Sequence, residues 1–180
     1  MWKEEGRRIV FNCPVFSIGE RSCRSPDNEL KTFTVMDSRD WAIIIPVVGK
    51  KEFVMVRQWR HGSGELSLEF PGGVFEPGED ATAAAKRELK EETAYEALSI
   101  IKLGECSPNP AIMSNKVHFF LAEDLKFTGK QDLDEDEYVD VCLMPAAEVF
   151  RSMGKPPYIH ALMGTALSFY LQNKMPDLTL

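Results

Sequence analysis

Three glutamates, Glu88, Glu91 and Glu92, stand at positions i, i+3 and i+4 of one short stretch of the chain. In a helix this spacing places three carboxylates on one face, where like charges cost roughly a few tenths of a kcal/mol per pair. A solvated acidic face is the ordinary explanation for such a cluster. A glycine-rich turn before it, suited to close backbone approach to a ligand, and the adjacent Arg87 favour a bound cation instead.

The segment that carries these carboxylates is predicted to be a helix over Ala81–Thr93. Asp80 stands where an N-cap residue is expected, and the segment contains good helix formers with no further Gly or Pro. Before it come paired glycines, Gly72 and Gly73, and a Glu76-Pro77-Gly78 turn that reverses the chain. The sequence therefore predicts a turn followed by a helix as the frame of the site.

This stretch resembles the Nudix box, G-x5-E-x7-R-E-U-x-E-E-x-G-U, in which U is an aliphatic residue. Two positions depart from the pattern. Ala94 replaces a glycine, at a cost of roughly 1–2 kcal/mol if the helix ends in a left-handed residue there, and Tyr95 replaces an aliphatic residue. The residues that match in one register are Gly73, Glu79, Arg87, Glu88, Leu89, Glu91 and Glu92.

The resemblance implies an α/β fold, a Nudix α/β/α sandwich with a mixed β-sheet over residues 41–180. Residues 1–40 would form a β-rich segment of the kind found in the ADP-ribose pyrophosphatase-like branch, where such segments commonly pair two subunits. We therefore expect a homodimer in which residues 8–36 contact the partner. An early hairpin with uncovered strand edges gives a physical reason for this pairing.

The resemblance also implies a metal site for Mg2+ or Mn2+. Its ligands would be Glu88 and Glu92, with Glu91 assisting and the backbone carbonyl of Gly72 as a further oxygen. Magnesium prefers oxygen ligands and bridges to substrate phosphates, which suits carboxylates along one helix face. A metal-activated water would then attack a pyrophosphate phosphorus and release two monophosphates.

The general base is left open by the sequence, because relatives place it either on the box helix, at Glu91 or Glu92, or on a later acidic loop. Here the acidic stretch Asp132–Glu137 precedes a predicted strand. Glu137 is favoured, followed by Glu135. A solvated turn is an equally good explanation for any one of these loop carboxylates.

Substrate contacts are suggested by the segment Arg57-Gln58-Trp59-Arg60, which resembles the part of ADP-ribose pyrophosphatases that meets phosphate and base. Arg57 belongs to this segment, Arg60 is suited to a phosphate, and Trp59 is suited either to stacking on adenine or to the core. Glu69 matches an acidic position near the metals in the family, or is an ordinary strand residue. The three histidines, His61, His118 and His160, lack mutual spacing and are expected to be structural.

The substrate class depends on the residues after the box. Pro110 lies where the ADP-ribose pyrophosphatase branch has a characteristic proline. Asn115 stands where that branch has a glutamate, which weakens the assignment to ADP-ribose but not to pyrophosphate hydrolysis.

Composition narrows the function classes. The chain has 180 residues, 44% hydrophobic and 27% charged, as in an ordinary globular domain, and a net charge of −7. That charge argues against nucleic acid as a partner, since Lys and Arg are too few to neutralise phosphates.

The start of the chain lacks an apolar signal region and no run is long enough to span a membrane, so a cytoplasmic protein is expected. The four cysteines show no metal spacing and are expected to be reduced, mostly buried thiols: Cys13, Cys23, Cys106 and Cys142.

The rest of the chain alternates predicted strands with two late helices. A turn is expected at Gly49-Lys50-Lys51, and the helices are expected from Pro145, with proline in the first turn, and over Ile159–Asn173. The expected strands are Ile9–Phe11, Val15–Cys23, Leu30–Met36, Trp41–Val48, Phe53–Trp59, Glu65–Phe70, Ile100–Leu103, Val117–Ala122 and Tyr138–Met144.

Together these observations predict a metal-dependent hydrolase of a nucleoside diphosphate linked to another moiety, with ADP-ribose or a nucleotide sugar as the leading substrate. The first rival is a nucleoside triphosphate pyrophosphohydrolase, against which the long leading β-segment and Pro110 count. The second rival is a non-catalytic sensor of an ADP-ribose-type ligand. Such sensors usually lose the box carboxylates, which this chain keeps.

Overall fold

The computed structural model describes residues 1–49, 51–135 and 137–175. Lys50, in one expected turn, and Asp136, in the acidic loop, lie outside the described residues. The chain forms two compact units. One contains residues 1–40 together with 106–117, and the other contains residues 41–105 and the chain from His118 onward.

The first unit is a three-stranded antiparallel sheet in the order β1-β2-β3, made of β1 (Lys3–Asn12), β2 (Phe16–Arg24) and β3 (Leu30–Ser38). The three leading strands expected from the sequence are therefore present; β1 and β3 are longer than predicted, and β2 is shifted by one residue. Between β2 and β3 the turn ends at Asn28, whose φ of 66° is the left-handed conformation that asparagine tolerates. The 106–117 segment joins this unit through Met36, whose N–H donates to Ile112 O at 2.7 Å and whose carbonyl accepts from Ser114 N at 3.1 Å.

The second unit is built on a six-stranded sheet. Its order is β6-β5-β4-β8-β7, with β9 paired to β5 from Glu52 to Arg57. β4 is apolar throughout and buried except at its ends, as expected for a central strand. The strands are β4 (Trp41–Val48), β5 (Glu52–Arg60), β6 (Glu65–Glu69), β7 (Tyr95–Cys106), β8 (Val117–Phe127) and β9 (Asp140–Pro145).

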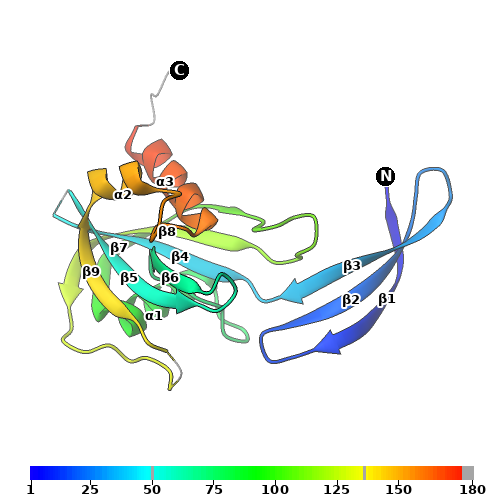
Figure 1. Cartoon of the computed structure of the whole chain (residues 1–180), viewed down its shortest axis with the longest axis horizontal. Coiled ribbons are helices and arrows are strands. Elements are labelled where there is room, and N and C mark those ends of the chain that lie inside the picture. Colours follow the sequence, from blue (N-terminus) through cyan, green and yellow to red (C-terminus); the bar gives the residue numbers. More distant parts are fainter. Residues whose placement is uncertain (50, 136, 176–180) are drawn as a thin grey trace. The chain divides into compact units, whose positions relative to one another are not determined.

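Helices cover both faces of this sheet: α1 (Ala81–Thr93) lies on one side, and α2 (Ala146–Ser152) and α3 (Ala161–Lys174) lie on the other (Figure 1). Successive strand residues point to opposite faces, so each strand contributes to both cores. On the second face, Phe119 contacts Phe169 of α3 with ring centroids 5.2 Å apart. The core under α1 consists of Ala42, Ile44, Ala84, Ala85, Leu89, Phe120 and Ala122. The expected α/β/α sandwich with a mixed sheet is confirmed.

Several boundaries differ from expectation. Pro145 ends β9 and is the N-cap residue of α2, so the helix starts one residue later than predicted. His160 caps α3 instead of lying inside it, because its Nδ1 accepts from Leu162 N at 3.2 Å. The four cysteines are free, as expected, but partly exposed. Within the described part of the chain, no helix combines the length and apolar character needed to cross a membrane.

Candidate active site

The carboxylate cluster lies on α1, whose two ends are set by capping hydrogen bonds. The side chain of Asp80 accepts hydrogen bonds from Thr82 N at 2.9 Å and Ala83 N at 3.0 Å, satisfying two amides of the first turn. The helix ends at Ala94, which has a left-handed φ of 57° and whose N–H donates to Lys90 O. The strained cap expected from the alanine is therefore present.

Two of the three glutamates on this helix are buried. Glu88 is 8% exposed and Glu92 is 4% exposed, whereas Glu91 is partly exposed. Burial raises the pKa of Glu88 to about 7, against the effect of the Arg87 charge, and burial raises the pKa of Glu92 to about 8. Desolvation disfavours the charged form of a carboxylate. This pair of carboxylates therefore gains stability in its ionised form from a cation.

Arg87 organises the cluster from its solvent side. Its Nε and Nη2 donate to both carboxylate oxygens of Glu79 at 3.0 and 2.9 Å. Its Nη1 lies 2.8 Å from both Glu88 Oε1 and Glu91 Oε2, and Nη2 also donates to Val74 O at 3.1 Å. Arg87 makes its bidentate bond to Glu79, which anchors the guanidinium, while the carboxylates of the cluster receive single bonds.

The paired glycines bring the backbone against both buried carboxylates. Gly72 N donates to Glu92 Oε2 at 2.8 Å. A Cβ at Gly72 would lie 2.1 Å from Ala42 O, and a Cβ at Gly73 would lie 2.5 Å from Glu88 Oε1. Glycine is required at Gly72, where the contact is with strand backbone, whereas a side chain at Gly73 would displace the Glu88 carboxylate.

Arg60 and Glu69 form a second charged pair beside this cluster. Arg60 Nε and Nη2 bond both oxygens of Glu69 at 2.9 and 2.6 Å, and Glu69 is 1% exposed. Burial opposes ionisation of Glu69, but the hydrogen bonds and charge of Arg60 hold its pKa below the ordinary value. The charge of Arg60 also acts on Glu92 and Glu137, which places it near both.

The predicted substrate contacts divide between the two faces of β5. Arg57 and Trp59 point to the face opposite Arg60, because strand residues alternate. Arg57 Nη2 forms an exposed ion pair with Asp140 at 2.8 Å, and Trp59 is 50% exposed, so Trp59 is not a core residue. The structure therefore brings Arg60 and Glu69 together near the carboxylates but not Arg57 and Trp59.

The acidic loop approaches the cluster through Glu137. The pKa values of Glu88 and Glu92 are raised mainly by burial, then by the neighbouring charges of Glu91 on Glu88 and of Glu88 on Glu92, and least by the charge of Glu137. Glu137 is exposed, and its Oε2 accepts from Asp134 N at 3.3 Å. Glu135 is exposed in the same loop.

Pro110 and Asn115 belong to the first unit, with the leading strands. Pro110 is exposed. Asn115 is 2% exposed, and neither its amide nitrogen nor its amide oxygen has a hydrogen-bond partner among the described residues.

One contact next to the site was missed by sequence reasoning. Phe70 N, just before Pro71 and Gly72, donates to the sulfur of Met163 at 2.9 Å. Nothing in the sequence distinguishes Met163 from other core methionines, and it comes 93 residues after Phe70.

The donor set fits a hard divalent cation. Within residues 1–49, 51–135 and 137–175, no three His, Cys, Asp or Glu side chains already lie together as a metal-binding group. Magnesium, however, is usually held by one or two carboxylates, its remaining positions being filled by water and substrate phosphates. Glu88 and Glu92, both buried and both with raised pKa, supply such carboxylates.

Comparisons with known proteins agree with this geometry. The family model for the NUDIX domain matches residues 38–163. An ADP-ribose pyrophosphatase of Bacillus subtilis (strain 168) is 30% identical over 140 residues, covering 77% of this chain and 76% of that protein. A mouse (Mus musculus) ADP-sugar pyrophosphatase is 41% identical over 108 residues, covering 58% of this chain and 48% of that protein. The solved structure of an ADP compounds hydrolase superposes with a TM-score of 0.84 at 24% identity, covering 96% and 95% of the two chains, which shows a shared fold.

Proposed function

The chain belongs to the NUDIX family, in its ADP-ribose pyrophosphatase-like branch, and is a Nudix pyrophosphohydrolase; from this premise we propose that it hydrolyses ADP-ribose or a nucleotide sugar with a divalent metal. The observation that carries the proposal is the buried pair Glu88 and Glu92, packed against the glycine backbone at Gly72 and Gly73. Two desolvated carboxylates beside a sterically tight loop suit a metal-bound pyrophosphate.

Glu88 and Glu92 would hold Mg2+ or Mn2+, with Glu91 assisting and the carbonyl of Gly72 as a further oxygen. When bound, such an ion neutralises charge on the pyrophosphate and lowers the pKa of water. Arg87 keeps Glu88 and Glu91 oriented through its Nη1 while Glu79 anchors its other donors. The Gly72 amide holds one oxygen of Glu92 and leaves the other for the ligand.

The proposed reaction is the attack of water on one phosphorus of the pyrophosphate. The new P–O bond forms as the bridging P–O bond breaks, so ADP-ribose would give AMP and ribose 5-phosphate. The proton of the water passes to a carboxylate. Glu137 is the favoured base because its charge acts on both buried glutamates, and Glu135 is the second choice.

Arg60 is proposed to bind a substrate phosphate. Its Nε and Nη2 are held by Glu69, which fixes the guanidinium plane and leaves Nη1 directed elsewhere. A half-exposed guanidinium held in this way is preorganised for an anion. Trp59 and Arg57 lie on the other face of β5, so the proposal gives them no contact with the phosphate that Arg60 binds.

The test is turnover by the purified full chain with Mg2+ or Mn2+ against ADP-ribose, ADP-glucose, GDP-mannose and a nucleoside triphosphate. The proposal predicts AMP and a sugar phosphate from ADP-ribose and cleavage of at least one other nucleotide sugar. Hydrolysis of the triphosphate alone, to monophosphate and pyrophosphate, would favour the first rival function. Tight ADP-ribose binding with no turnover under any metal would favour a sensor.

A further inference from the structure

The outer edge of β6 is held by the chain that enters α3. β6 pairs with β5 along one edge only. On the other edge, Leu68 N donates to Pro157 O at 2.9 Å and Phe70 N donates to Met163 Sδ at 2.9 Å. These are alternate amides, as expected for the side of a strand that faces away from its neighbour.

From Phe70 the same pattern continues without a break into the carboxylate cluster. Ile44 N donates to Pro71 O at 2.9 Å, and Ala42 N donates to Gly73 O at 2.9 Å. Between them, Gly72 N donates to Glu92 Oε2 at 2.8 Å. Each residue from Phe70 to Gly73 is thus fixed by one hydrogen bond, and Met163 supplies the first.

Met163 is well placed to hold this position. It is 1% exposed, in the first turn of α3, whose start is fixed by the Nδ1 of His160. A thioether is a weak acceptor, but Phe70 is 2% exposed, so its amide is shielded from bulk water. Without the sulfur, the Phe70 amide would be buried and unpaired, and the backbone would move to relieve that cost.

We propose that Met163 is a positioning residue for hydrolysis, whose sulfur fixes the Phe70 amide and thereby places the Gly72 amide that orients Glu92. This inference rests on the proposed function. It gives α3 an indirect role in orienting the carboxylate of Glu92, through the Phe70 and Gly72 amides.

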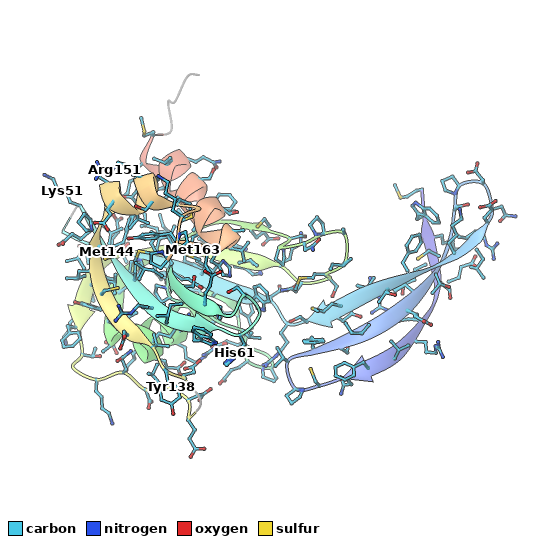
Figure 2. All side chains as sticks on the ribbon, viewed as in Figure 1. Lys51, His61, Tyr138, Met144, Arg151 and Met163 are labelled. Carbon is cyan, nitrogen blue, oxygen red and sulfur yellow. The ribbon has the colours of Figure 1, made fainter. Side chains whose placement is uncertain are left out.

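The experiment compares Met163→Leu, which removes the acceptor at similar volume, with Met163→Gln, whose carbonyl oxygen restores one. Met163→Ile is a second variant without the sulfur, for the case in which Leu does not fold. Met144→Leu is the control for the same substitution on another element, since Met144 lies on β9 (Figure 2). The readouts are kcat, KM, the Mg2+ activation constant and the amide exchange rates of Phe70 and Gly72 by NMR.

We expect M163L to raise the amide exchange rates of Phe70 and Gly72. It should also lower kcat about tenfold with KM nearly unchanged, because a misplaced catalytic group weakens transition-state stabilisation more than substrate binding. M163Q should recover most of both effects, and M144L should behave as wild type. Wild-type exchange rates in M163L, or equal losses in M163L and M163Q with lower melting temperatures, would overturn the proposal. If the wild type cleaves no substrate, the proposed function fails, while the exchange rates still decide whether Met163 positions the loop.

Discussion

At the scale of single residues, the site is defined by the contrast between carboxylates that have a counterion and carboxylates that lack one. Glu69 is almost fully buried yet keeps a lowered pKa, because Arg60 bonds both of its oxygens. Glu92 is nearly as buried and has a backbone amide in place of a cation, so burial raises its pKa to about 8. In the proposed function, a metal ion supplies the positive charge that Arg60 supplies to Glu69.

Replacing Glu92 by glutamine tests that role directly. The amide oxygen of glutamine can still accept from Gly72 N, so the fold should be kept, but the charged ligand is lost. We expect turnover to fall by about 10³-fold or more. Circular dichroism and melting temperature check the fold, and near-normal hydrolysis by E92Q would contradict the metal assignment.

The raised pKa of Glu92 also predicts how stability depends on pH in metal-free protein. Between pH 4.5, the ordinary pKa of a glutamate, and about pH 8, the folded protein keeps a proton that the unfolded chain has released. The free energy of unfolding therefore falls as pH rises through this window, by an amount on the order of a few kcal/mol.

The measurement is urea unfolding of wild type and E92Q in EDTA at pH 5 and pH 8. E92Q lacks the titrating group, so the free energy of unfolding of E92Q relative to wild type should rise with pH. Contributions from groups not coupled to Glu92, such as His160, cancel in the difference. Added Mg2+ should reduce this difference in the free energy of unfolding at pH 8, because it stabilises ionised Glu92 in the wild type. A constant difference across pH would contradict this account.

At the scale of elements, the end of α1 carries a cost that the sequence already suggests. Ala94 adopts a left-handed φ of 57°, roughly 1–2 kcal/mol unfavourable for a residue with a Cβ, whereas burial of its methyl group returns about 0.8 kcal/mol. The net strain sits two residues after Glu92. It leaves the carboxylates in place, because the helix hydrogen bond from Ala94 N to Lys90 O is intact.

Ala94→Gly should therefore raise the free energy of unfolding by up to about 1 kcal/mol and the melting temperature by about 2–4 °C. The control is Ala83→Gly at an exposed position in the first turn of the helix, which should lower stability by up to about 1 kcal/mol, since glycine is a poor helix former. Thermal unfolding followed by circular dichroism measures both. A94G that loses as much stability as A83G would show that the cap is not strained.

At the scale of the whole molecule, the leading sheet presents apolar side chains to solvent. A small three-stranded sheet with exposed apolar groups is marginal by itself and suits a covered surface. The exposed large hydrophobic residues of its strands and turns are Trp2, Ile9, Val10, Phe11, Val15, Leu30 and Phe33.

We therefore predict that the chain is a homodimer in which residues 8–36 contact the partner. Ile9→Lys, at a position 63% exposed, should shift the mass measured by light scattering from dimer to monomer at micromolar concentration. Leu98→Lys, at a position 83% exposed on β7, is the control and should leave the mass unchanged. A wild-type monomer at high micromolar concentration would contradict the prediction.

The sequence by itself determined the parts of this protein that depend on near neighbours. The bounds of α1 at Ala81 and Thr93, the Asp80 cap and the central strand from Trp41 to Val48 all agree with prediction. Capping, helix propensity and apolar periodicity act over a few residues, so a short stretch of sequence is enough to predict them. The face shared by Glu88, Glu91 and Glu92 follows from the helix period alone.

Only the tertiary structure decided which side chains meet across the sheet. The family resemblance groups Arg57 and Trp59 with Arg60, but strand alternation places them on the opposite face of β5. The register of β5 with β9 sets Arg57 beside Asp140. The bidentate pair of Arg60 and Glu69 depends on the pairing of β5 with β6. The contact of Phe70 with Met163 depends on how α3 packs. Such contacts join residues far apart in sequence, and packing and strand register, which no local pattern encodes, bring them together.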